Sequence, residues 1–440
     1  MKTAQEKVFR DPLYGNISIP YKSVLELIDT PEFQRLHRIR QLGMCFTVFH
    51  GAEHSRFQHC IGVMWLMHRI LEHWKERRLI KLRRESAEAA VVAALLHDIG
   101  HGPFSHALEN TFSVTDHETM GQLIVKERML QVMRSNHVDP LEVLAILKGT
   151  HPEALLHEIL SSQLDVDRMD YLQRDSLYTG AKYGLFDIDR IIFTLRPLYD
   201  KSRDCHVCAI DPKGADAVES YLFSRYYMHW QVYLHKSVRA YEVQLRVILR
   251  RARAVYADNP GSLYLPPNLR FLFEASPNAK VSPEFLRAYL GLDDFDFYHV
   301  IKLWAQGQDA ILADLCQQFI ERRPFKAFDH PGDGPVYERI KKYIRKIYGE
   351  KSDWYIHEDT SVNRGYGLYE PGSTATPIRV LDNCPQGWKE ISSITRTKAI
   401  TALSEQIRRP LLLVPRSCAS HIRSWLGADK PYQEYLFEEL

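Results

Sequence analysis

An adjacent His and Asp at the end of an apolar run is the feature that most limits what this chain can fold into. Residues 89–96 are all apolar, His97-Asp98 follow directly, and Gly102-Pro103 come soon after. The apolar run predicts a buried helix, and the Gly-Pro pair predicts that this helix ends just past His97-Asp98. An imidazole and a carboxylate that emerge together from a core offer two ligands to one cation. The sequence therefore predicts a metal site at the end of a buried helix.

Two further segments supply partners for this pair. His59 opens the amphipathic segment 61–71, and Asp167 lies in the acidic run 165–170. Two imidazoles and two carboxylates neutralise a divalent ion, suit Mn, Fe, Ni, Zn or Mg, and leave coordination positions free for water or a phosphate oxygen. Burying two carboxylates without a cation would be costly, which disfavours a purely structural role. The predicted metal ligands are His59, His97, Asp98 and Asp167.

The order of these ligands along the chain resembles that of the HD-domain phosphohydrolase superfamily. Longer motifs resemble the deoxynucleoside triphosphate triphosphohydrolases, most of all the sterile-alpha-motif and HD-domain dNTPase, and they lie at residues 7–12, 29–36, 41–43, 56–59, 97–106 and 165–171. The similarity runs with gaps from residue 7 to about residue 240, and no sterile-alpha-motif module is expected. The resemblance implies metal-dependent hydrolysis of deoxynucleoside triphosphates (dNTPs) to a deoxynucleoside and triphosphate, by attack of water at the α-phosphorus.

Helical spacing groups the residues that would face such a substrate. Asp167, Tyr171 and Asp175 fall at i, i+4 and i+8, so one helix face would carry a metal ligand, an aromatic ring and a carboxylate. A second set with the same spacing lies on a long helix expected over residues 215–256, and it consists of Arg225, His229 and Tyr233.

The resemblance assigns roles in substrate binding. Arg225 and Lys182 would hold phosphates, and Arg56 would contact the α-phosphate. Tyr171 would pack under the deoxyribose, where a 2′-hydroxyl would clash. Gln41 and Asp175 would bind the 3′-hydroxyl, and Tyr233 would flank the base or sugar.

Extra histidines near His97-Asp98 are candidates for acid catalysis, because imidazole exchanges protons near neutral pH. They are His101, His106 and His117. Glu109 follows His106 by three residues on the same helical face, so it could orient that imidazole and raise its pKa. His106 is therefore the predicted general acid, which protonates the departing 5′-oxygen.

The resemblance also implies regulation by nucleotides bound between subunits of a homo-oligomer, a dimer or a tetramer. Lys7, Asp29 and Gln34 match residues of the family's effector site. His37, however, stands where the family pattern has an Arg that reads guanine. An oligomer that assembles without guanine therefore stays open.

Two other classes of function stay open as well. A different HD phosphohydrolase, acting on nucleoside monophosphates or cyclic nucleotides, would keep the metal ligands without needing residues that read the sugar. A nucleotide-sensing or nucleic-acid-binding scaffold would not need intact ligands, which argues against it. A purely structural interpretation of the helix face that carries Tyr171 also stays open, since Asp170 and Arg174 at i, i+4 fit a plain ion pair and Tyr171 fits a core position.

Charge and hydropathy limit the partners. The 440 residues carry a net charge of +2, which gives no support to nucleic-acid binding. The apolar run 89–96 is too short to span a bilayer, and residues 1–6 contain no apolar signal region, so we expect a cytoplasmic enzyme that does not interact with membranes.

The expected fold is mainly α, with a helical HD-domain core and a small α/β lobe at the C-terminal end. The expected division is an HD-domain core over residues 1–257, a helical extension over 258–345 and the α/β lobe over 346–440. Short strands are expected at 378–381 and 410–414, a helix around 397–408, and a hairpin loop at 205–208. The basic run 341–346 is interpreted as the solvated face of an amphipathic helix, with its apolar face formed by Ile340, Ile344 and Ile347.

Overall fold

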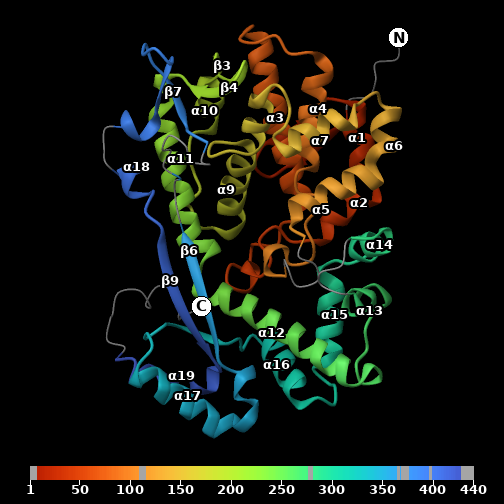
Figure 1. Ribbon diagram of the computed structural model, residues 1–440, viewed down its shortest axis with the longest axis vertical. Coiled ribbons are helices and arrows are strands. Elements are labelled where there is room, and N and C mark those ends of the chain that lie inside the picture. Colours follow the sequence, from red (N-terminus) through yellow and green to blue (C-terminus); the bar gives the residue numbers. More distant parts are fainter. Residues whose placement is uncertain are drawn as a thin grey trace. The chain divides into compact units, whose positions relative to one another are not determined.

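Apolar residues at helical spacing make most of the described chain helical, as the sequence predicts. The computed structural model in Figure 1 describes residues 7–108, 115–275, 281–363, 367, 376–395 and 399–427, without the side chains of residues 106, 363, 399 and 402. The chain divides into two units. Unit 1 contains residues up to 233 together with 266–297 and 363–406, and unit 2 contains residues 234–265, 298–362 and those from 407 on.

Three helices of unit 1 carry the predicted metal ligands, and they are α3 (Arg56–Glu76), α4 (Arg84–Leu96) and α9 (Val166–Thr179). Helix α3 packs against both α4 and α9 (Figure 1). The apolar residues 89–96 are buried, and α4 ends at Leu96, directly before His97-Asp98. The Asp165 side chain caps α9 by accepting a hydrogen bond from the backbone N–H of Arg168 at 2.8 Å. This cap places Asp167 in the first turn of α9.

Unit 1 contains further helices. They are α1 (Lys22–Ile28), α2 (Pro31–Gln34), α5 (His117–Ile124), α6 (Leu130–Ser135), α7 (Pro140–Lys148), α8 (Ala154–Leu160), α10 (Ile188–Thr194), α11 (Ala215–Met228), α13 (Pro267–Glu274), α14 (Pro283–Leu290) and α18 (Ala399–Ala402). Helix α15 (Asp294–Trp304) begins in unit 1 and continues in unit 2.

Unit 1 also holds two small sheets. The first is the antiparallel hairpin of β1 (Val8–Asp11) and β2 (Gly15–Ser18). The second has the order β3-β4-β7-β8, and its strands are β3 (Leu195–Asp200), β4 (Cys205–Ile210), β7 (Arg379–Leu381) and β8 (Trp388–Glu390). Strand β7 runs parallel to β4, whereas the other two pairs are antiparallel. Pro197 lies in β3, at the edge of the sheet, where a missing N–H is tolerated.

Unit 2 combines helices with a three-stranded sheet of order β5-β9-β6. Its elements are α12 (Lys236–Asp258), α16 (Ala310–Ile320), α17 (Pro335–Tyr348), α19 (Ala419–Trp425), β5 (Lys326–Asp329), β6 (His357–Asn363) and β9 (Ile407–Val414). Ile340 and Ile344 of α17 are buried as predicted, but Ile347 is 49% exposed, so the prediction that it faces inward is wrong.

The mainly helical fold with small sheets is confirmed, but the structure corrects three more local predictions besides that for Ile347. The segment 205–208 is not a hairpin loop, because it lies in β4, where the side chains of these four residues alternate between buried and partly exposed. The helix expected around residues 397–408 is shorter, since α18 ends at Ala402 and β9 begins at Ile407.

The third correction concerns the long helix expected over residues 215–256. It is interrupted after Met228 by a π-helical turn, His229–Tyr233, and α12 starts only at Lys236. His235 caps the new helix by accepting a hydrogen bond from the backbone N–H of Ser237. The interruption needs no Gly or Pro, which is why the sequence pattern did not indicate it.

Both strands expected near the C-terminal end are present, as β7 and β9, but they belong to different sheets. Each unit is assembled from segments that are far apart in the sequence. The division into three consecutive segments, with boundaries at residues 257 and 345, stays a prediction.

Candidate active site

The four predicted metal ligands lie together in unit 1. Ligand atoms of His59, His97 and Asp98 are all within 4.8 Å of one another. His59 Nε2 is 3.2 Å from His97 Nε2, and Asp167 Oδ1 is 3.1 Å from His59 Nε2 and 3.6 Å from His97 Nε2. Helices α3, α4 and α9 therefore deliver two imidazoles and two carboxylates to one point.

Hydrogen bonds fix which nitrogen of each imidazole faces this point. His97 Nδ1 is 2.8 Å from the carbonyl oxygen of Ala94, and His59 Nδ1 is 2.8 Å from Asp170 Oδ2. Each Nδ1 therefore donates its proton away from this point, and each Nε2 is the nitrogen that faces it. The two Nε2 atoms are 3.2 Å apart, so they are stable side by side only when a proton or a cation lies between them. This donor set fits a divalent cation.

The electrostatics of the cluster point the same way. Burial lowers the pKa of His59, but hydrogen bonds to Asp167 and Asp170 outweigh this and raise it to about 10. Burial opposes the ionisation of Asp98, yet the charges of His97 and Arg56 hold its pKa well below the usual range. The carboxylates therefore stay ionised and demand a positive charge at this position.

Asp170 is a site residue that sequence reasoning missed, because its pairing with Arg174 fitted a plain ion pair. Its carboxylate is fully buried, and it accepts hydrogen bonds at 2.9 Å from both Nε and Nη2 of Arg174. Arg174 Nη1 in turn donates to Asp11 Oδ2 at 2.8 Å. Gly62 of α3 makes room for this pair, since a Cβ there would lie 1.9 Å from Asp170 Oδ1. The same carboxylate thus orients His59 and neutralises a buried arginine.

The residues around Asp98 include several that were predicted for catalysis. Arg56 is buried and donates hydrogen bonds to Asp98 and, at 2.9 Å, to Ser105 Oγ, so its predicted contact with an α-phosphate stays a prediction. His101 Nε2 is 3.4 Å from Asp98 Oδ1, and its ring stacks on His117 at a centroid distance of 3.9 Å. The side chain of His106 and all of Glu109 lie outside the described residues.

A connected set of polar side chains follows Tyr171 along α9. Asp175 is buried, with Oδ1 2.8 Å from His54 Nε2, and its Oδ2 accepts a hydrogen bond from the Tyr233 hydroxyl at 2.8 Å. The Tyr233 ring packs edge-on against Tyr171, with centroids 5.9 Å apart. Gln41 joins this set through its backbone N–H, which donates to the His54 carbonyl at 3.0 Å, and its side-chain Oε1 is buried without a hydrogen-bond partner.

Two arginines, Arg168 and Arg225, bring positive charge near Tyr171. Among the residues that the structure describes, Nε and Nη1 of Arg225 are buried without a hydrogen-bond partner, and so is Nε of Arg168. Both guanidiniums act on Tyr171, although burial dominates and raises its pKa to about 12. Burial, followed by the charges of these two arginines, lowers the pKa of His229 to about 3, so this imidazole is neutral. Lys182 is exposed and makes no hydrogen bond or ion pair within the described ranges.

The predicted effector residues lie on the N-terminal elements of unit 1. Lys7 and Asp29 are exposed, and Gln34 donates a side-chain hydrogen bond to the Ile28 carbonyl at 2.9 Å. His37 is exposed and stacks on the Phe57 ring at a centroid distance of 3.7 Å. Binding of an effector at these residues stays a prediction. Across the part of the chain that the structure describes, no helix is both long and apolar enough to cross a membrane.

Known proteins share this architecture. Residues 56–175, which include all four predicted ligands, match the family described as "HD domain". A crystal structure of a phosphohydrolase from Bacteroides thetaiotaomicron superposes with a TM-score of 0.83 at 31% sequence identity, over 94% of this chain and 100% of that one. The chain belongs to the HD-domain phosphohydrolase family. The predicted family resemblance is thereby confirmed. HD domains bind divalent metals, and this phosphohydrolase contains a His-His-Asp group that could hold one.

Sequence relatives of this HD-domain phosphohydrolase differ in how much of it they cover. The uncharacterized protein YwfO of Bacillus subtilis is 36% identical over 410 residues, which cover 91% of this chain and 89% of that protein. The deoxynucleoside triphosphate triphosphohydrolase SAMHD1 of Gallus gallus is 30% identical over 296 residues, which cover 59% of this chain and 48% of that protein.

Proposed function

We propose that this HD-domain phosphohydrolase hydrolyses dNTPs to a deoxynucleoside and triphosphate, by attack of water at the α-phosphorus. The observation that carries the proposal is the guanidinium of Arg225. Among the described residues, its Nε and Nη1 are buried without a hydrogen-bond partner, and its charge acts on Tyr171. Tyr171 lies on α9, one helical turn after the predicted ligand Asp167. Unpaired buried donors are costly, and a phosphate group would satisfy them.

The second support is the polar set that includes Asp175. The free Oε1 of Gln41 is a buried acceptor, which suits a hydroxyl donor. Asp175 already accepts bonds from His54 and Tyr233, but a carboxylate has lone pairs for more. If a sugar 3′-hydroxyl donates to these groups, C2′ would face the Tyr171 ring. The ring face would offer no hydrogen-bond partner to a 2′-hydroxyl. This arrangement favours deoxyribose.

The positions of the residues suggest a role for each of them in the proposed reaction. A divalent cation held by His59, His97, Asp98 and Asp167 would supply Lewis-acid stabilisation of phosphate oxygens and would activate water. Arg225 orients the phosphate chain, and Asp170 keeps His59 in the tautomer that presents Nε2. We assign the proton for the departing 5′-oxygen to His106.

The test is product analysis with each dNTP and the matching ribonucleotide, in the presence of Mn or Mg. We expect dNTPs to be hydrolysed at least about tenfold more efficiently, because stranding a buried hydroxyl costs about 1 to 3 kcal/mol and ~1.4 kcal/mol gives tenfold. Tyr171→Ala should narrow this preference, whereas Tyr171→Phe keeps the ring and should retain it. Equal rates for dATP and ATP, or release of phosphate or pyrophosphate in place of triphosphate, would refute the proposal.

Variants of Arg225 test the phosphate contact separately. Arg225→Gln should lower kcat/KM for dNTPs at least about tenfold, since a charge-assisted hydrogen bond is lost. The matched control is Arg84→Gln, which removes the same charge from an exposed position at the start of α4 and should leave kcat/KM unchanged. Equal kcat/KM values for the two variants would contradict the assignment.

A further inference from the structure

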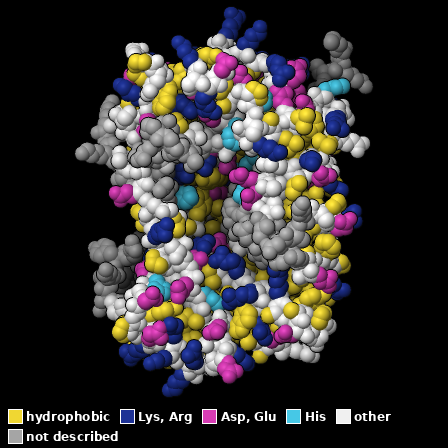
Figure 2. Space-filling view, viewed as in Figure 1, with side chains coloured by type: hydrophobic (Ala, Val, Ile, Leu, Met, Phe, Trp, Pro, Cys, Tyr) yellow, Lys and Arg dark blue, Asp and Glu magenta, His cyan; other side chains and the backbone are white. Residues whose placement is uncertain are grey.

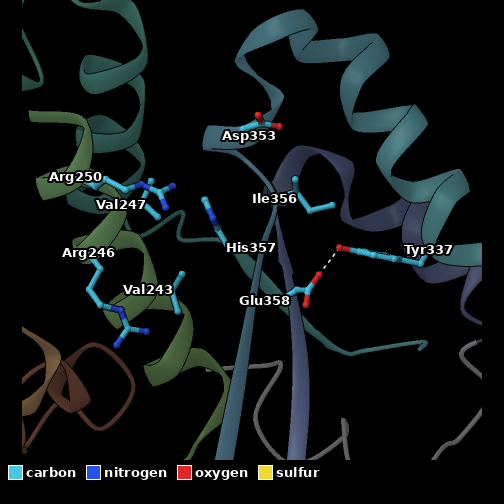
Figure 3. Close-up of a pocket in the computed structure, with 9 residues that line it drawn as sticks. All are labelled: Val243, Arg246, Val247, Arg250, Tyr337, Asp353, Ile356, His357 and Glu358. Atoms are coloured by element: carbon cyan, nitrogen blue, oxygen red, sulfur yellow. Dashed lines mark hydrogen bonds between the residues drawn. The ribbon is translucent and has the colours of Figure 1, made fainter. Parts of the chain in front are cut away.

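Unit 2 contains a pocket built entirely from its own elements (Figure 3). Its volume is about 580 Å³, within the range of small-molecule sites. One wall is α12, and the others come from α17, the turn after it and β6. None of the residues predicted to bind metal or substrate lines this pocket.

The α12 wall is cationic. Arg246 and Arg250 are one helical turn apart, and both project toward the pocket in Figure 3. Like charges at this spacing repel each other, so the pair favours an anion between or beside the two guanidiniums. Arg250 makes no hydrogen bond or ion pair within the described residues, and its guanidinium lies 5.0 Å from the Trp354 ring centroid.

The positive charge of this wall is only partly neutralised. Arg246 Nη2 is 3.3 Å from Asp359 Oδ1, but Arg239 already donates two hydrogen bonds of 2.9 Å to the same carboxylate. Positive charge is also in excess over the whole of unit 2, whose described residues include 20 Lys and Arg and 12 Asp and Glu, a net charge of +8. Figure 2 shows Lys and Arg side chains around α17 at the lower end of the view. Such a field attracts anions and is focused by a concave surface.

The rest of the pocket offers an apolar floor and hydrogen-bond acceptors. Val243, Val247 and Ile356 supply the apolar surface. His357 Nε2 is 3.1 Å from the Trp354 carbonyl, so this nitrogen donates and Nδ1 is left as an acceptor. Burial lowers the pKa of His357 to about 4, which keeps this acceptor free of a proton. Opposite the arginines, Glu358 accepts a hydrogen bond from the Tyr337 hydroxyl.

We propose that this pocket binds a nucleoside phosphate at a second site, separate from the HD cluster. Arg246 and Arg250 bind the phosphate, because guanidinium groups match its oxygens in geometry and charge. The apolar floor takes the flat face of the base, and His357 and Glu358 accept hydrogen bonds from hydroxyl or amino groups. The proposal does not depend on the substrate proposed for the HD site.

The experiment is calorimetric titration of the full chain with AMP and with inorganic phosphate, in a chelator that keeps divalent cations from the HD site. We expect saturable binding of AMP and at least about tenfold weaker binding of inorganic phosphate, which lacks the base and sugar. Arg250→Gln and Arg246→Gln/Arg250→Gln should each weaken AMP binding at least about tenfold. The matched control Lys342→Gln/Arg345→Gln removes two charges from exposed positions of α17 and should bind AMP like the unmodified protein.

Binding at the HD site is separated by Arg225→Gln, which should leave AMP binding in chelator unchanged. Loss of AMP binding in Arg225→Gln together with normal binding in Arg250→Gln would overturn the proposal, and it would leave the dNTP site intact. No binding of AMP at millimolar concentrations, or inorganic phosphate binding as tightly as AMP, would also overturn it. The Arg250 side chain is exposed and makes no hydrogen bond in the described structure, so its replacement removes from the fold only the contact with the Trp354 ring.

Discussion

Replacing Asp170 with Asn tests whether this carboxylate contributes to metal affinity independently of its contribution to folding stability. The Asn retains the shape and one acceptor, but it removes the charge that holds His59 Nδ1 at 2.8 Å and Arg174 at 2.9 Å. Loss of a partner that orients a metal ligand usually lowers metal affinity 10- to 100-fold. We expect Asp170→Asn to bind Mn about 10- to 100-fold more weakly than the unmodified protein, measured by competition with a chelating dye.

The effect on folding follows from burial. Asp170 and Arg174 are both fully buried, and breaking such a pair costs about 3 to 5 kcal/mol. Because Arg174 keeps its bond to Asp11 at 2.8 Å, we expect a loss near the lower end, about 3 kcal/mol, in urea unfolding. The matched control is Asp189→Asn, whose carboxylate is 76% exposed in its pair with Arg69 and should contribute less than about 1 kcal/mol.

A double variant completes the argument. In Asp170→Asn/Arg174→Gln the buried positive charge is also removed, but Asp11 loses its guanidinium partner, so only part of the lost stability should return. Metal affinity should stay low, because His59 still lacks a carboxylate partner. Metal affinity within twofold of the unmodified protein in Asp170→Asn would refute the positioning role. Recovery of metal affinity in the double variant would show that Asp170 acts through stability alone.

Four further predictions concern the same unit. His97→Ala or Asp167→Ala should each abolish metal binding and lower turnover by orders of magnitude, and full metal occupancy with normal turnover in either variant would contradict the ligand assignment. His106→Ala should keep metal and substrate binding while kcat falls roughly 10²- to 10⁴-fold, and loss of metal would instead make it a ligand. Gly62→Ala, whose Cβ would lie 1.9 Å from a carboxylate oxygen, should lower both thermal stability and metal affinity, and an unchanged melting temperature would contradict this. Burial, and then two nearby arginines, lower the pKa of His229 to about 3 in the folded protein. Because the unfolded chain binds a proton at this residue below about pH 6.5, the free energy of unfolding should fall from pH 7 to pH 5. The fall should be smaller in His229→Gln, which cannot take up this proton.

The sequence predicted those parts of the site that depend on local geometry. His97-Asp98 follow an apolar run, so the end of α4 was recognisable. Asp167, Tyr171 and Asp175 keep their spacing because α9 is regular over all three residues. The set that contains Arg225 spans a π-helical turn, where the 3.6-residue rule does not hold, and its placement depends on packing that no local pattern encodes.

The parts of the site and of the fold that the sequence did not predict depend on contacts between distant segments. Asp170 has an obvious partner four residues away, and nothing in the local pattern indicates that His59, 111 residues earlier, binds the same carboxylate. Strands β3 and β4 are short, and β4 also pairs with β7, which lies more than 150 residues further along the chain. A prediction from local periodicity therefore assigned this region to helices and a loop.

The pairing of β7 with β4 also governs how unit 1 can be completed during synthesis. Glu158 lies inside the HD segment, yet its buried partner is Arg379 of β7, with Nη1 2.9 Å from Oε2. A growing chain that has passed residue 210 must hold the open edge of β4 until β7 leaves the ribosome. An early stop before β7 would leave Glu158 without its buried guanidinium and would expose a strand edge on which other chains can pair and aggregate.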